Sequence, residues 1–80
     1  MKIPRSYIRE MGKMYNVDKG LEIAQYHFSE GKLPASEYLL KLKNLKMELA
    51  SIVPKYSEFK DWKIKLKLQI LEELKKLSKK

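Results

Sequence analysis

The sequence contains no cysteine and a single histidine, and these shortages exclude several kinds of chemistry. Without cysteine the chain forms no disulfide and no thiolate zinc site. One histidine does not supply the spaced ligand pairs of the common metal motifs. We interpret His27, which lies between Tyr26 and Phe28, as a structural residue rather than a catalytic base. We therefore expect neither a metal nor a cofactor.

Catalytic motifs are missing as well. The three glycines stand apart at positions 12, 20 and 31, so the chain has no glycine-rich phosphate loop. Glu72 and Glu73 are adjacent and would point to different sides of a helix, so they do not form a general acid/base pair. The sequence has no nucleophile elbow and no His-Glu-x-x-His motif. These absences predict a protein that is not an enzyme.

Long apolar runs are also lacking, because no run exceeds three residues. A membrane-spanning helix needs about 20 apolar residues, and the start of the chain lacks the apolar stretch of a signal peptide. We therefore expect a cytoplasmic protein without a membrane span. Lys, Glu, Leu and Ile are abundant while Asn and Gln number two each, a composition typical of proteins from hot environments.

The chain has the composition of one small domain with unevenly distributed charge. Hydrophobic residues make up 44% of its 80 residues, which is typical of a globular domain covering 1–80. The net charge is +8, of which residues 1–40 carry +1 and residues 41–80 carry +7. Such asymmetry is typical of surfaces that bind phosphates, acidic peptides or anionic lipid, and equally of a solvated helix face.

Apolar periodicity predicts three helices, at about residues 6–30, 34–53 and 57–77. We expect the basic residues that follow them to form a frayed C-terminal tail. Gly31 is suited to end the first helix and Pro54 to end the second, while Ser57 is the expected cap of the third. Gly12 leaves open whether the first helix is continuous or is kinked or split near residues 12–18. The fold class that we predict is all-α, a small three-helix bundle.

Residues 62–70 fit two patterns. Apolar and polar residues alternate from Trp62 to Ile70, which is typical of a half-buried strand. However, the chain has no second alternating segment to pair with, and residues 71–77 are strongly helix-forming, so we favour a helix. A strand that pairs across a homodimer or with another protein stays open as the alternative.

As a helix, the third segment carries apolar residues on a wide arc. One stripe consists of Phe59, Trp62, Leu66, Ile70 and Leu77, and the other of Ile64, Leu68 and Leu71. Such an arc is typical of a helix that packs against two others, or of one that borders an apolar groove for a partner. We predict that the partner-binding residues are Trp62, Ile64, Leu66, Leu68 and Leu71. The residues predicted to contact phosphates or an acidic partner are Lys60, Lys63, Lys65 and Lys67.

Two functional hypotheses follow. The first is a helical protein-interaction module or accessory subunit that docks a partner protein or an acidic helical peptide in an apolar groove beside the basic C-terminal helix. The alternative is a small basic subunit of a nucleic-acid-handling complex, such as a ribosome, polymerase or repair assembly, that contacts phosphates through its lysines. Aromatic residues near lysines can stack on bases. We favour a core position for Trp62, which leaves Tyr56 as the freer stacking candidate.

The boundaries of these helices carry a further pattern. Glu30-Gly31 ends the first, Ala35 and Tyr38 open the second, and Pro54 closes it. With these residues, and with large apolar residues along the third helix, the stretch 21–77 resembles a microtubule-interacting-and-trafficking (MIT) domain. The third-helix residues in register with that family are Phe59, Trp62, Leu66 and Ile70. Gln69 stands where the family tends to have an arginine.

The resemblance to MIT domains implies a module without catalysis of its own. It implies the docking of short helical or extended motifs, typically from membrane-remodelling filament subunits, in grooves beside the third helix. Such motifs are often acidic, which would suit Lys63, Lys65 and Lys67.

Overall fold

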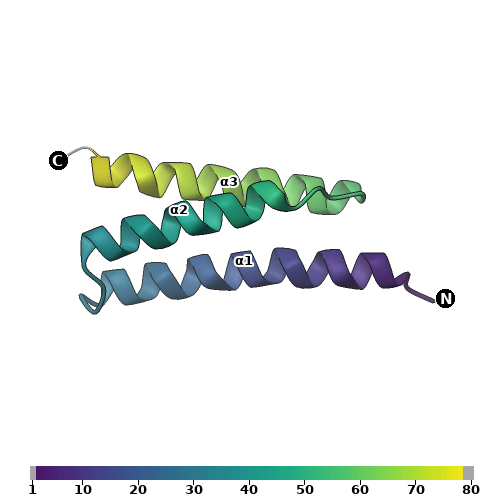
Figure 1. Ribbon diagram of the computed structural model, residues 1–80, viewed down its shortest axis with the longest axis horizontal. Coiled ribbons are helices and arrows are strands. Elements are labelled where there is room, and N and C mark those ends of the chain that lie inside the picture. Colours follow the sequence, from purple (N-terminus) through teal and green to yellow (C-terminus); the bar gives the residue numbers. More distant parts are fainter. Residues whose placement is uncertain (1, 79–80) are drawn as a thin grey trace.

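The computed structural model describes residues 2–78, and within them the chain forms three α-helices joined by short connections (Figure 1). They are α1 (Arg5–Ser29), α2 (Ala35–Ser51) and α3 (Ser57–Ser78). Because α2 runs antiparallel to both neighbours, α1 and α3 are parallel, and the bundle is a rod of 49 × 20 × 15 Å. The predicted all-α three-helix fold is confirmed. Lys79 and Lys80, part of the predicted basic tail, lie outside the described residues.

The first helix is continuous through the region where a kink or split was an open alternative. Gly12 lies within α1, although glycine costs a helix about 1 kcal/mol relative to alanine. On the inner side of the helix, Met14, Val17 and Leu21 recur at helical spacing and are fully buried. Burial of this face favours one unbroken helix over the weak local propensity of Gly12.

The turn after α1 is built by Gly31, as the sequence predicts. Its φ angle is 73°, a conformation that L side chains rarely adopt. The Lys32 N–H donates to the carbonyl of His27 at 2.9 Å, and the Gly31 N–H donates to the carbonyl of Phe28 at 3.1 Å. This pair of bonds is the Schellman motif, which satisfies carbonyls at the helix end and redirects the chain toward α2.

The start of α3 differs in one detail from the prediction. Ser57 is the first helical residue rather than the cap. Instead, the carbonyl of Tyr56 accepts the N–H groups of Phe59 and Lys60, at 3.0 and 3.1 Å. The Tyr56 ring packs edge-on against Tyr7 of α1, with 5.0 Å between the ring centroids. The helix therefore begins one residue earlier than a cap at Ser57 would allow.

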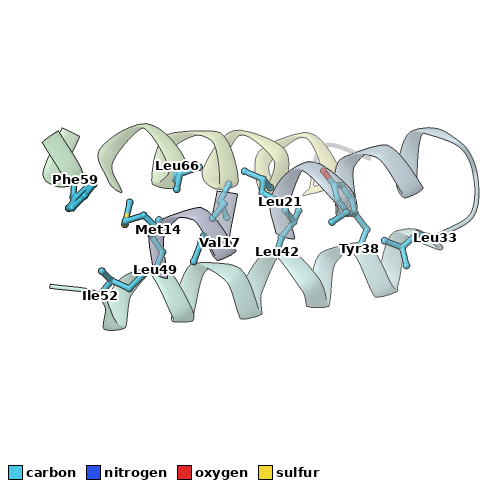
Figure 2. Close-up of a cluster of buried hydrophobic side chains, with 12 residues drawn as sticks. Met14, Val17, Leu21, Leu33, Tyr38, Leu42, Leu49, Ile52, Phe59 and Leu66 are labelled. Carbon is cyan, nitrogen blue, oxygen red and sulfur yellow. The ribbon is translucent and has the colours of Figure 1, made fainter. Parts of the chain in front are cut away.

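The core lies along the axis between the three helices, and Figure 2 shows its side chains converging from all of them. Its buried members are Met14, Val17, Leu21, Ala24, Leu33, Tyr38, Leu42, Leu49, Ile52, Phe59, Leu66 and Ile70. Leu66 and Ile70 point inward while Ile64 and Leu68 are exposed. A strand would place all four on one face, so the strand alternative for residues 62–70 is wrong and the favoured helix is confirmed.

Candidate functional site

A groove runs along the seam between α2 and α3. It consists of two hollows of about 420 and 190 Å³ that share Lys46 and Ala50 and therefore adjoin. We call it the α2/α3 groove, and its lining residues are Lys43, Lys46, Met47, Leu49, Ala50, Lys63, Lys67 and Leu74. On α2 these residues recur three and four positions apart, so a single face of that helix supplies them.

The floor of the α2/α3 groove is apolar. Leu49 of α2, which is buried, and Leu74 of α3, which is half-buried, line it, while Ala50 and Met47 are exposed, Met47 with 71% of its surface. A methionine side chain is flexible and polarizable, so it can adjust to apolar groups of different shapes. Leu71, three residues before Leu74 on α3, is 37% exposed and lies outside the groove lining. The groove therefore offers apolar contact area without further rearrangement of the core.

The walls of the α2/α3 groove carry charge of one sign. Within residues 2–78, its lining includes four lysines and no Asp or Glu. The ion pairs in that part of the chain are Lys19–Glu22 and Lys76–Glu73, which lie elsewhere. The positive charge of the groove is therefore not neutralised by neighbouring carboxylates, and it attracts anionic groups.

Two polar contacts tie α3 to α2 and to the residue that follows it. The Lys63 ammonium, in the groove lining, donates to the carbonyl of Ile52 at 2.7 Å, just past the end of α2. A cation in this position satisfies a free carbonyl and interacts favourably with the helix dipole. Lys63, a predicted phosphate contact, thus already has a structural partner.

Outside the groove lining, the Tyr38 hydroxyl of α2 donates to Oε1 of Glu73 of α3 at 2.6 Å. Burial, together with this hydrogen bond, raises the pKa of Tyr38. The same bond lowers the pKa of Glu73, to which Lys76 also donates at 3.1 Å. Phe28 stacks on the Tyr38 ring with 4.2 Å between the ring centroids, so the end of α1 supports the contact.

The five predicted partner-binding residues separate into two groups. Ile64, Leu68 and Leu71 are exposed on the outer side of α3 and accessible to a partner. Leu66 is 2% exposed and belongs to the core, so it is not accessible to a partner in this structure, and its role as a partner contact stays a prediction. Trp62 is half-buried, and its indole N–H donates to Asp18 of α1 at 3.0 Å. The 3.6-residue turn of the helix points positions 62 and 66 inward and positions 64 and 68 outward.

The four predicted lysines do not form one cluster either. Lys63 and Lys67 line the α2/α3 groove, while Lys60 and Lys65 are exposed on α3 outside its lining. Residues two apart on a helix face different sides, so Lys65 and Lys67 cannot bind the same group. Sequence reasoning missed the contribution of α2. The spacing of its basic and apolar residues outside the core stripe carries the signal, at Lys43, Lys46, Met47 and Ala50.

Both aromatic candidates for base stacking are half-buried and make contacts within the chain. Tyr56 is half-buried between Tyr7 and Phe59, and its hydroxyl bonds to the Ser6 hydroxyl at 2.9 Å. Its ring packs between α1 and α3, and its role as the freer stacking residue stays a prediction. Trp62 is held by Asp18 and by contact with Phe59.

Other site types give no candidate in the part of the chain that the structure describes. No group of three or more His, Asp or Glu side chains there could hold a metal ion. None of the three described helices combines the length and the hydropathy needed to cross a membrane. Comparisons with protein-family models, with curated proteins and with solved structures found no match to the chain. The resemblance to MIT domains stays a prediction.

Proposed function

We propose that this chain is a non-enzymatic interaction module that docks an acidic amphipathic helix of a partner protein in the α2/α3 groove. The observation that carries the proposal is the combination of an apolar floor with walls of lysine alone. The floor provides contact area for the apolar stripe of a helix. The lysines meet carboxylates on either side of that stripe.

A helix fits this site for reasons of shape. Two neighbouring helices leave a groove between them that accepts the ridge of a third, with residues at i, i+3, i+4 and i+7 as anchors. Met47, Ala50 and Leu74 supply apolar lining against which such anchors would pack. Lys43 and Lys46 on one side and Lys67 on the other then flank the bound helix.

Charge narrows the choice of occupant. A second copy of the chain in this groove would bring its own lysines against these lysines, and like charges in contact cost affinity. A nucleic acid would satisfy the lysines but not the apolar floor. In addition, the Trp62 and Tyr56 rings are half-buried and engaged in contacts with α1, so an acidic helix is favoured over the nucleic-acid alternative.

The test uses a synthetic helical peptide with leucines at i, i+3, i+4 and i+7, flanked by glutamates, and a counterpart in which lysines replace the glutamates. We expect the acidic peptide to bind in fluorescence anisotropy and the basic one not to bind. Lys46→Glu should weaken binding at least about tenfold, because it reverses a charge in the groove wall. The matched control is Lys41→Glu on the same helix. Lys41 lines a hollow between α1 and α2, so its substitution should change the affinity less than about twofold.

Equal binding of both peptides, or equal losses in the two variants, would contradict the proposal. An oligonucleotide that binds more tightly than the acidic peptide, with an affinity that falls steeply as salt increases, would support the nucleic-acid alternative instead.

A further inference from the structure

A second apolar surface lies on the side of α1 that faces away from the bundle. Its residues each expose between 42% and 56% of their surface, and the α2/α3 groove does not use them. We call this surface the α1 outer face, and its apolar residues are Ile8, Met11, Tyr15, Ile23 and Tyr26. The buried residues of α1, such as Val17 and Leu21, lie on the opposite side of the helix.

The α1 outer face carries charges of both signs, unlike the α2/α3 groove. Lys19 pairs with Glu22 at 3.7 Å, and its ammonium lies 5.9 Å from the centroid of the Tyr15 ring. The chain segment that contains this face, residues 1–40, has a net charge of only +1. An identical copy can therefore approach it without the repulsion that opposes self-association through the lysines of α2 and α3.

The order of residues on this face is self-complementary. At 3.6 residues per turn, Ile8, Tyr15, Lys19 and Tyr26 fall on one line along the helix. Consider two copies of α1 that run antiparallel and cross at the level of Val17 along the helix axis. Ile8 then lies opposite Tyr26 of the second copy. Tyr15 then lies opposite Lys19 of the second copy, so each contact occurs twice, as twofold symmetry requires.

Gly12 and the helix ends fit the same register. A Cβ atom placed on Gly12 would have nothing within 4 Å, so no contact within the chain requires a glycine there. In the antiparallel pair, Ile23 of the second copy lies over this bare backbone, where a glycine permits close approach. At each end Arg5 lies near Glu30 of the second copy, which places opposite charges together.

We infer that the chain forms an antiparallel homodimer through the α1 outer face. The 25 residues of α1 span about 37 Å. A specific interface of standard size buries about 800 Å² per partner. We expect a contact made by one helix of this length to be smaller than that. The dimer is therefore concentration-dependent. The α2/α3 grooves stay free in it, because they open on other helices.

The first test is sedimentation equilibrium of the full chain from micromolar to millimolar concentration. We expect the mass to rise from monomer toward dimer, and Ile8→Lys to shift the midpoint to at least about tenfold higher concentration. The matched control is Ile64→Lys on α3. It replaces the same residue type at similar exposure, 57% against 52%, and should leave the midpoint unchanged. A monomer at every concentration, or equal effects of the two variants, would overturn the inference.

The second test fixes the orientation and uses the absence of native cysteine. Chains with Ile8→Cys and chains with Tyr26→Cys are mixed and oxidised. An antiparallel dimer gives a disulfide between the two kinds of chain, whereas a parallel dimer gives disulfides within each kind and would overturn the inference. Circular dichroism confirms that each variant is folded.

Salt distinguishes this association from peptide docking. Two copies with a net charge of +8 each repel at long range, so added salt should strengthen the dimer. Docking of an acidic peptide in the α2/α3 groove should weaken with salt. Failure of one interaction therefore leaves the other testable.

Discussion

The α1 outer face and the α2/α3 groove both expose apolar side chains, yet the charges around them differ. Lysines alone flank Met47 and Leu74 in the groove, whereas Lys19 and Glu22 pair with each other on α1. Exposed apolar area by itself indicates an interaction surface but not its partner. The surrounding charges make the selection, because a surface of one sign repels a copy of itself and a mixed one need not.

Helical phase produces this difference within a few residues of sequence. On α2, Lys43 and Lys46 line the groove toward α3, while Lys41 and Glu48 line the hollow toward α1 together with Asn44. One helix therefore presents a basic surface to one side and a mixed surface to the other. Part of the lysine excess in residues 41–80 is therefore gathered in one groove, where no acidic residue joins the lining.

The largest expected effect is a loss of stability, and it should differ between a core position and an exposed position of α3. Leu66→Asp places a charge at a buried position and should cost about 3 to 5 kcal/mol of unfolding free energy. Leu68→Asp, at a position that is 60% exposed, should cost less than about 0.5 kcal/mol. Urea denaturation followed by circular dichroism measures both. Similar costs for the two variants would break the distinction between a core side and a free side of α3.

These two leucines also show where sequence reasoning reaches its limit. The helices and the turn at Gly31 were predictable because periodicity, glycine and proline act locally. Whether Leu66 or Leu68 points inward was not, because both belong to apolar stripes at helical spacing. The choice depends on which stripe packs against α1 and α2, and that is a property of the assembled bundle. The share of the groove contributed by Lys43 and Lys46 was missed for the same reason.

The second prediction concerns the hydrogen bond between Tyr38 of α2 and Glu73 of α3. Tyr38→Phe removes the hydrogen bond to Glu73 and should cost about 1 to 2 kcal/mol near neutral pH. The pKa of Glu73 is lowered in the folded chain, so its contribution to stability is present above the ordinary value of 4.5 and is lost as pH falls below it. The pKa of Tyr38 is raised, so its contribution is present below pH 10 and is lost as pH rises further.

Thermal unfolding of the wild type and of Tyr38→Phe across this pH range measures both limbs. We expect the difference between the two proteins to be largest between the two ordinary pKa values and to shrink in acid and in strong base. Tyr26→Phe, on the exposed α1 outer face, is the control and should follow the wild-type curve at micromolar concentration, where the chain is monomeric. A constant difference at all pH values would mean that the hydrogen bond does not couple to either group.

The smallest expected effect is the change in stability when a glycine of α1 is replaced by alanine. It should differ between Gly12, which faces away from the bundle, and Gly20, which faces α2. Gly12→Ala should raise the monomer's stability by about 0.5 to 1 kcal/mol, because the added methyl group has nothing within 4 Å and alanine favours a helix. Gly20→Ala should gain less, because its methyl group would lie 3.0 Å from Cδ2 of Leu45 in α2. Denaturation at micromolar concentration measures the monomer alone.

The same Gly12→Ala variant sharpens the comparison between the two surfaces. If Ile23 of a second copy approaches the bare backbone at Gly12, the methyl group stabilises the monomer while it weakens self-association. Sedimentation should then show a dimer midpoint at higher concentration, although the chain itself is more stable. Peptide binding in the α2/α3 groove should not change, because Gly12 lies on α1 and outside its lining. An unchanged midpoint would remove Gly12 from the α1 contact and leave its place in an exposed helix without a structural reason.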